Sequence, residues 1–204
     1  MSVRRLGIFG GTLDPIHFGH LIVAEQARVQ LRLDEVQFIP CGEPAIPKDY
    51  AVTPGEHRYV MAQLATASHP AFRVRRLEID RPGPSFTVDT LRQLRAEVGP
   101  EADFFFILGS DALRQIYQWH QSELLFHLCY LAVGTRPGYG LPSLDHLRPE
   151  HRERVIPFQT VPVEISGRLI RSLVAAGQSV RYLLPENVEE YLQKHRLYRK
   201  SEGG

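Results

Sequence analysis

Two glycines and two histidines near the N-terminus have types and a spacing that suit phosphate chemistry. Gly10 and Gly11 follow a short apolar run, and His17 and His20 come after an Asp-Pro turn. Glycine lets the backbone approach a ligand closely, because no side chain intervenes. If His17 stands where a helix begins and His20 lies in its first turn, both rings face free backbone N–H groups, where anions bind favourably. The pair would then donate hydrogen bonds to phosphate oxygens and to charge that develops in a transition state.

Each part of this segment also has an ordinary explanation. A glycine pair after a strand is by itself a weak sign of nucleotide binding, and both the G-x-G-x-x-G fingerprint and the Walker sequence are absent. Two histidines three residues apart could be zinc ligands, but no third ligand stands nearby. The conjunction of strand, glycine pair, turn and spaced histidines is much more specific than its parts.

Six segments together resemble the signatures of one enzyme family. Residues 7–20 (GIFGGTLDPIHFGH) are similar to the G-G-T-F-D-P-x-H-x-G-H run of the nucleotidylyltransferases, which binds a nucleotide triphosphate. The other segments are 38–48 (FIPCGEPAIPK), 84–91 (PSFTVDTL), 106–119 (FILGSDALRQIYQW), 165–171 (ISGRLIR) and 182–198 (YLLPENVEEYLQKHRLY). They occur in the family's order, and they resemble the bacterial nicotinate-nucleotide adenylyltransferases in particular.

The resemblance implies an adenylyl transfer in NAD biosynthesis. The phosphate of nicotinate mononucleotide would attack the α-phosphorus of ATP, giving nicotinate adenine dinucleotide and pyrophosphate. Because the substrate supplies the nucleophile, the protein has to align the groups and neutralise charge. Mg²⁺ would be carried by the ATP phosphates, with no metal ligand from the protein.

The resemblance also assigns roles to the matched residues. The catalytic groups would be His17, His20 and Arg171. ATP would be bound by Gly10, Gly11, Lys48, Gly109, Asp111 and Ser166. Nicotinate mononucleotide would be bound by Thr87, Trp119 and His120. Without the resemblance, Arg171 would be a surface residue of an amphipathic helix, Lys48 a solvated loop residue and Trp119 a core residue.

Four positions depart from the family pattern. Leu13 replaces a phenylalanine, which is an apolar exchange of small cost. Pro47 stands where the family has a histidine, so one polar contact is lost there or supplied elsewhere. Gly167 and Arg168 replace small hydroxyl residues after Ser166. A hydroxyl donor to phosphate is thereby lost, and Arg168 is expected to compensate as a charged donor.

Two other functions stay open at this point. The acceptor could be nicotinamide mononucleotide, since backbone amides can be arranged for a carboxamide as well as for a carboxylate. The chain could instead be a nucleotide-binding regulator that has lost catalysis, although His17, His20 and Arg171 are all present. Phosphopantetheine or cytidylyl transfer is less favoured, because those relatives lack the matches around Trp119 and at the C-terminus.

The elements that must position these residues alternate along the chain. Short apolar strands are expected at 6–9, 36–39, 73–79, 103–108, 128–133 and 155–158. Helices are expected between them, with Thr53 and Ser166 as capping residues of two of these helices. This alternation predicts an α/β fold, a Rossmann-like doubly wound parallel sheet with helices on both faces and the first strand central. Ligands then bind beyond the carboxyl ends of the strands.

Length and composition bound the remaining possibilities. The 204 residues suggest a single domain over residues 1–200, with 201–204 as a flexible tail. The net charge is +1, so neither nucleic acid nor an anionic membrane surface is an expected partner, whereas a homo-oligomer stays open. No apolar run approaches the roughly 18 residues of a membrane span. The two cysteines are expected to be free thiols, which indicates a cytoplasmic protein.

Overall fold

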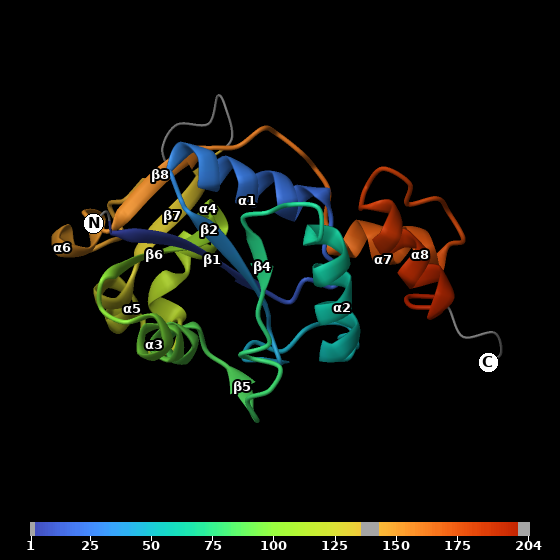
Figure 1. Cartoon of the computed structure of the whole chain (residues 1–204), viewed down its shortest axis with the longest axis horizontal. Helices are drawn as coiled ribbons and strands as arrows, with labels where there is room; N and C mark the ends of the chain where they lie inside the picture. Colours follow the sequence, from blue (N-terminus) through green and yellow to red (C-terminus); the bar gives the residue numbers. More distant parts are fainter. Residues whose placement is uncertain (1–2, 136–142, 200–204) are drawn as a thin grey trace.

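A six-stranded sheet, in which all strands are parallel, forms the centre of the molecule (Figure 1). The computed structural model describes residues 3–135 and 143–199, so the predicted tail at 201–204 lies outside the described residues. The strands stand in the order β4-β2-β1-β6-β7-β8. Their bounds are β1 (Arg4–Gly11), β2 (Glu35–Pro40), β4 (Phe72–Val74), β6 (Ala102–Gly109), β7 (Tyr130–Thr135) and β8 (Val155–Gln159). The Rossmann-like sheet with β1 at its centre is therefore confirmed.

Alternating side chains divide the apolar core between the two faces of this sheet. In β6, Phe105 and Ile107 belong to one core cluster, whereas Phe104, Phe106 and Leu108 belong to the other. Successive side chains of a strand point to opposite faces, so a strand that is buried on both faces consists almost entirely of apolar residues. This explains why the segment DFFFIL at 103–108 is so apolar.

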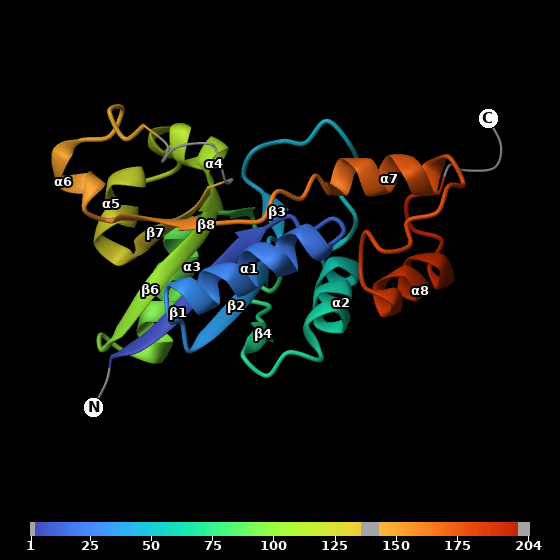
Figure 2. The same ribbon diagram turned by 90° about the horizontal axis from the view of Figure 1, so that it is seen from above.

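Helices cover both faces. On one face lie α1 (Phe18–Gln30) and α2 (Gly55–Thr66), and the layer continues into α7 (Gly167–Ala175) and α8 (Glu186–Lys194) beyond α2 (Figures 1 and 2). On the other face lie α3 (Thr87–Val98), α4 (Ser110–Arg114), the 3₁₀ turn η1 (Ile116–Gln118) and α5 (Ser122–Leu128). The short α6 (Pro149–Arg152) precedes β8. A separate two-stranded ladder joins β3 (Glu43–Pro44) to β5 (Pro84–Ser85).

Two local predictions were wrong. The strand expected at 73–79 is short, because the chain turns after Val74 and the Arg76 carbonyl accepts hydrogen bonds from Ile79 and Asp80. Thr53 does not cap α2, whose N-cap residue is Pro54. Thr53 is buried instead, and its N–H is bound by the distant Asp14 carboxylate while its carbonyl is bound by Arg58 of α2 itself.

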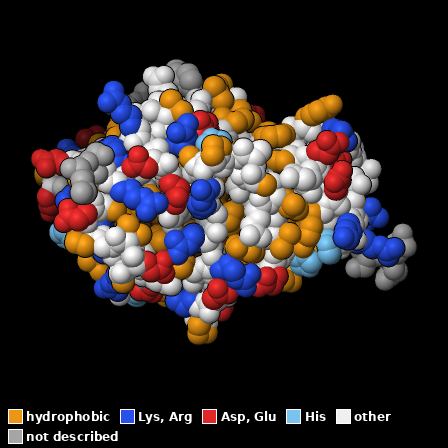
Figure 3. Space-filling model, in the orientation of Figure 1, with side chains coloured by type: hydrophobic (Ala, Val, Ile, Leu, Met, Phe, Trp, Pro, Cys, Tyr) orange, Lys and Arg blue, Asp and Glu red, His pale blue; other side chains and the backbone are white. Residues whose placement is uncertain are grey.

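Other local predictions were confirmed. The hydroxyl of Ser166 caps α7 by accepting a 3.1 Å hydrogen bond from the backbone N–H of Leu169. Cys41 and Cys129 are both buried and free. On the face seen in Figure 3, Lys and Arg side chains lie among Asp and Glu side chains, as the nearly balanced charge implies. No helix within the ranges 3–135 and 143–199 is both long and apolar enough to cross a membrane.

Candidate active site

The strand order of the sheet reverses between β1 and β6. From β1 the sheet extends through β2 to β4, and from β6 it extends through β7 to β8. A parallel sheet binds ligands outside the carboxyl ends of its strands at such a switch point. Here β1 ends at Gly10 and Gly11, and β6 ends at Gly109. A Cβ on Gly109 would meet no atom within 4 Å, so space is open at the end of β6.

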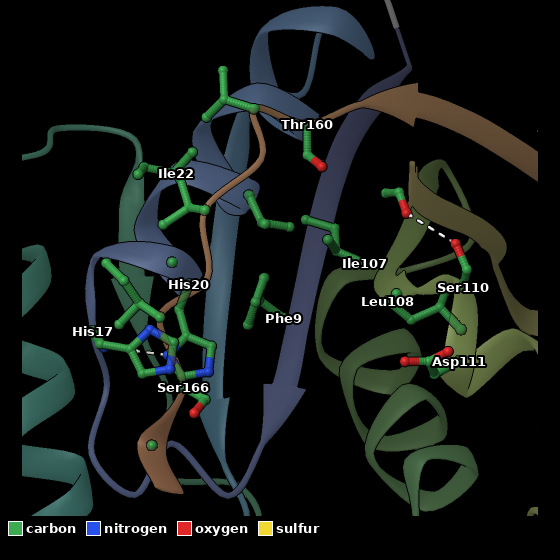
Figure 4. A pocket seen from close by; sticks show the side chains of 18 of the residues that line it. Phe9, His17, His20, Ile22, Ile107, Leu108, Ser110, Asp111, Thr160 and Ser166 are labelled. Atoms are coloured by element: carbon green, nitrogen blue, oxygen red, sulfur yellow. Dashed lines mark hydrogen bonds between the residues drawn. The ribbon is translucent and has the colours of Figure 1, made fainter. Parts of the chain in front are cut away.

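A cavity of about 1000 Å³ opens at this edge of the sheet (Figure 4). Its walls come from the start of α1, the junction of β6 with α4, and the segment that joins β8 to α7. Five of the predicted site residues line it: His17, His20, Gly109, Asp111 and Ser166. In Figure 4, the two histidines and Ser166 stand on one side, while Ser110 and Asp111 stand on the other. Residues separated by up to about 150 positions in sequence are thus brought together.

The two histidines form a stacked pair at the start of α1. His17 is the N-cap residue, and its backbone N–H donates a 3.2 Å hydrogen bond to Nδ1 of His20. The ring centroids are 3.7 Å apart. Because Nδ1 of His20 accepts this hydrogen bond, the proton of the neutral ring resides on Nε2. His20 can therefore donate a hydrogen bond from Nε2.

Burial keeps both imidazoles neutral at pH 7. Burial lowers the pKa of His17 to about 4. The pKa of His20 is also well below its usual value, first because of burial and then because of the charge that His17 would carry. Nδ1 of His17 is buried without a hydrogen-bond partner in the described part of the chain. The pair thus offers polar N–H donors rather than a permanent positive charge.

Arg114 also lines this cavity, although sequence reasoning did not identify it. Its guanidinium forms an ion pair with the carboxylate of Asp111 one helical turn away. The i,i+3 spacing in α4 was a signal that could have found this pair. Ser110 is held by a 3.3 Å hydrogen bond from its hydroxyl to the Gly134 carbonyl. The end of β6 therefore carries an exposed carboxylate with a cation beside it.

Arg171 contacts the first motif, but it does not line the cavity. Its Nη1 donates a 2.6 Å hydrogen bond to the Asp14 carbonyl, and its guanidinium lies 3.5 Å from the centroid of the Tyr50 ring. Arg168, which was expected to replace a lost hydroxyl donor, forms an exposed ion pair with Asp49 at 2.8 Å. Both arginines of α7 thereby reach residues outside their own helix.

A second cavity, of about 440 Å³, holds the remaining predicted residues. These are Gly10, Gly11, Lys48, Thr87, Trp119 and His120. The two glycines and Lys48, which the resemblance assigned to ATP, thus line the same cavity as the residues assigned to the acceptor. The indole of Trp119 is nearly perpendicular to the ring of Phe106, with the ring centroids 5.9 Å apart. Phe9 lines the first cavity while its neighbour Gly10 lines the second, so the end of β1 stands between them.

Two buried charged residues beside the second cavity were missed by sequence reasoning. Arg58 is 1 % exposed and donates hydrogen bonds to the carbonyls of Thr12 (2.8 Å), Gly42 (3.0 Å) and Thr53 (2.7 Å). Glu78 is 6 % exposed and lines the cavity itself. Neither residue has a local sequence signal, because its partners come from other elements.

No cluster of three or more His, Cys, Asp or Glu side chains suited to a metal ion occurs in residues 3–135 and 143–199. Asp111 is the carboxylate that lines the first cavity, and its partner there is Arg114. A Mg²⁺ ion that enters with a triphosphate takes its ligands mainly from phosphate oxygens and water, so it does not need such a cluster.

Comparisons with known proteins show the family of this chain. The cytidylyltransferase-like family matches residues 8–173. A probable nicotinate-nucleotide adenylyltransferase from Moorella thermoacetica is 47 % identical over 199 residues, covering 96 % of this chain and 92 % of that protein. The corresponding protein from Acidothermus cellulolyticus is 41 % identical, covering 98 % of this chain and 97 % of its own length.

A solved structure shares the fold. The nicotinic acid mononucleotide adenylyltransferase of Plasmodium falciparum, complexed with NaAD, superimposes with a TM-score of 0.76 at 19 % identity. The match covers 96 % of this chain and 97 % of that chain. On the strength of the family match and the close relatives, this chain belongs to the cytidylyltransferase-like family and, within it, to the nicotinate-nucleotide adenylyltransferases.

Proposed function

We propose that this protein joins ATP and nicotinate mononucleotide to form nicotinate adenine dinucleotide and pyrophosphate. The observation that carries the proposal is the pair of cavities at the end of β1. The first contains the stacked histidines, and the second contains the chain's one tryptophan. Relatives that are 41–47 % identical over nearly the whole chain bear the name of this activity, which supports the same assignment.

The transfer needs alignment and charge neutralisation more than covalent catalysis. The acceptor phosphate attacks the α-phosphorus of ATP in line with departing pyrophosphate, so both substrates must meet where the two cavities adjoin. Gly10 and Gly11 leave the backbone open there. Nε2 of His20 donates a hydrogen bond to a phosphate oxygen, and the start of α7 at Ser166 offers backbone N–H groups. A Mg²⁺ ion carried by the ATP phosphates would neutralise part of their charge.

The acceptor is recognised in the second cavity. Thr87 is the first residue of α3, and the carbonyl of the N-cap residue Phe86 accepts backbone hydrogen bonds only from the N–H groups of Asp89 and Thr90, so those of Thr87 and Val88 have no partner within the helix. A carboxylate accepts hydrogen bonds at both oxygens, whereas a carboxamide would turn an NH₂ group toward these donors. One buried unpaired polar group costs about 1–3 kcal/mol, so two mismatches give discrimination on the order of a hundredfold. The Trp119 indole stacks on either ring and contributes affinity rather than choice.

A comparison of acceptors tests this function. Pyrophosphate release is measured with MgATP and either nicotinate or nicotinamide mononucleotide, and kcat/KM is compared. We expect nicotinate mononucleotide to be preferred on the order of a hundredfold. Comparable values would point to the nicotinamide form as an equal acceptor. Absence of pyrophosphate with both would indicate a nucleotide-binding regulator.

A further inference from the structure

Glu78 is a buried carboxyl group that lines the second cavity and has no role in the transfer described above. It lies in the turn that follows β4, outside the strands and helices that carry the predicted site residues. A buried carboxylate costs free energy unless hydrogen bonds and charges compensate for its lost hydration. The groups that donate hydrogen bonds to the Glu78 carboxylate therefore show which part of the structure Glu78 stabilises.

Two hydroxyl groups from the acceptor segment point to Glu78. Thr90 Oγ1 donates a 2.6 Å hydrogen bond to Oε1 of Glu78. The Ser85 hydroxyl faces the same carboxylate and opposes the rise in the pKa of Glu78. Ser85 and Thr90 stand on either side of Thr87 in the sequence, so one carboxylate holds both flanks of the residue at the start of α3.

The direction of these hydrogen bonds requires an acceptor at Glu78. Ser85 Oγ accepts a 3.0 Å hydrogen bond from the Gly42 N–H, and Thr90 Oγ1 accepts a 2.9 Å hydrogen bond from Arg81 Nη2. Each hydroxyl has a single proton to donate. The Thr90 proton is directed to the carboxylate at 2.6 Å, since the other acceptor, the Phe86 carbonyl, lies at 3.4 Å. The Ser85 hydroxyl accepts from Gly42, so its proton is available to the carboxylate that it faces. An amide at this position would present an NH₂ group where only an acceptor fits.

The same chain of hydrogen bonds joins the opposite walls of the cavity. Gly42 belongs to the loop that leads to Lys48, and a Cβ there would lie 2.1 Å from the Glu78 carbonyl oxygen. The register of β3 with β5, which pairs Pro44 with Ser85, joins the same two walls. Burial raises the pKa of Glu78, whereas its hydrogen bonds and the charges of Arg81 and Arg58 oppose that rise. The carboxyl group is thus held between the walls by neighbours from several segments.

We propose that Glu78 is a positioning residue that sets the geometry of the acceptor site by holding Ser85 and Thr90 on both sides of Thr87. This inference rests on the proposed function, because it concerns recognition of the nicotinate carboxylate by the start of α3. Glu78 itself acts through Ser85, Thr90 and Gly42. Loss of its acceptor character would let the N–H donors at Thr87 move away from the positions that meet the carboxylate.

The test is the isosteric substitution Glu78→Gln. Trp119 is the only tryptophan and lines the acceptor cavity, so its fluorescence reports binding of nicotinate mononucleotide directly. We expect Kd and KM for nicotinate mononucleotide to rise about tenfold or more, the effect of one misplaced polar contact. KM for ATP, whose predicted contacts with the stacked histidines lie in the first cavity away from Glu78, should change by no more than about twofold.

Three comparisons separate positioning from general stability. Glu189→Gln replaces another buried glutamate, on α8 and outside the acceptor cavity, and should leave both KM values unchanged. Ser85→Ala and Thr90→Val each remove one of the two hydroxyl groups that face Glu78. These two variants are sufficient for the test if Glu78→Gln fails to fold. The double variant Glu78→Gln/Ser85→Ala should be less harmful than the sum of its parts, since both act on one chain of hydrogen bonds.

The outcomes distinguish this inference from the proposed function. An unchanged Kd for nicotinate mononucleotide in Glu78→Gln, or in both Ser85→Ala and Thr90→Val, overturns the positioning role. Equal rises in both KM values, together with a lower unfolding midpoint, also overturn it in favour of a purely structural role. If the parent protein gives neither a fluorescence change nor pyrophosphate with nicotinate mononucleotide, the proposed function fails first and takes this inference with it.

Discussion

His17 and His20 owe their chemistry to burial at a helix start. Their neutral rings are stacked, and the backbone of one residue determines the tautomer of the other. A neutral imidazole that has lost its hydration can donate a hydrogen bond to developing negative charge without first being reoriented. The pair also makes the folded protein sensitive to acid, because protonation must take place in a site that disfavours charge.

Replacement of His20 by alanine tests the donor. We expect His20→Ala to lower kcat by about two orders of magnitude, the scale of losing one donor to a transition state. Pyrophosphate release under saturating substrates measures this. His127→Ala, in which an exposed ring on α5 is removed, is the matched control and should behave as the parent does. Turnover of His20→Ala within a few-fold of the parent would contradict the role.

The low pKa of His17 predicts a specific loss of stability in acid. Below its ordinary value of 6.5 the unfolded chain binds a proton at His17, whereas the folded protein does not until about pH 4. The free energy of unfolding therefore falls as pH decreases through this window, by about 3 kcal/mol at most for this one group. Above pH 6.5 the ring is neutral in both states and contributes no pH dependence.

The variant His17→Gln isolates this contribution. The free energy of unfolding in urea is measured for parent and variant at pH 7, 5.5 and 4. Because the carboxylates titrate in both proteins, the difference between the two curves gives the contribution of His17. We expect the variant to lose less stability than the parent between pH 7 and 4. Parallel curves for the two proteins would show that His17 is not responsible.

At the scale of elements, the start of α7 rests directly on the turn after β1. A Cβ on Gly167 would lie 2.8 Å from the Asp14 carbonyl oxygen, which is the atom that accepts the hydrogen bond from Arg171. Glycine at this position, which departs from the family pattern, thus lets the two segments approach. Gly167 thus lacks the hydroxyl that the family has at this position, but it allows the backbone of α7 to lie closer to the backbone of Asp14.

Gly167→Ala should separate these two segments. Alanine favours a helix over glycine by at most about 1 kcal/mol, whereas the contact with a backbone oxygen adds an overpacking cost of about 1–3 kcal/mol. We expect a lower unfolding midpoint and a several-fold lower kcat. Thermal unfolding and pyrophosphate release measure the two effects. Ser172→Ala, at an exposed position of the same helix, is the control, and equal behaviour of both variants would refute the close contact.

For the whole molecule, Asp14 connects the first motif with the C-terminal segment. Its buried carboxylate accepts hydrogen bonds from the Tyr198 hydroxyl and from the Thr53 N–H, the latter at 3.1 Å. Burial, and then the charge of Asp14, raise the pKa of Tyr198, which keeps the hydroxyl protonated as a donor. Residues 184 positions apart thereby stabilise the same turn.

Tyr198→Phe removes this connection while preserving the ring. An acceptor left without its donor in a buried site costs about 1–3 kcal/mol, so we expect the free energy of unfolding in urea to fall by that amount. KM for ATP should rise as well, because the Asp14 turn leads directly to His17. The control is Tyr182→Phe, at a residue that is 82 % exposed, and it should have no effect. A Tyr198→Phe variant as stable as the parent would contradict the connection.

The sequence by itself determined the features that are encoded within short segments. The apolar runs and their alternation with helices predicted a parallel sheet with the first strand at its centre. Ser166 was identified as a cap because capping depends on a few consecutive residues. The motif around His17 and His20 likewise indicated a helix start that suits phosphate, since its residues lie within one strand-to-helix turn.

Only the tertiary structure decided which distant residues share a site. Thr53 was expected to be a helix cap, but its N–H is bound by the Asp14 carboxylate, 39 residues away in sequence, which the folded sheet edge brings next to it. The placement of Gly10 in the second cavity and the buried contacts of Glu78 also depend on long-range packing. Local patterns determine how each segment folds, whereas contacts between segments form only after the strand order has placed their ends side by side.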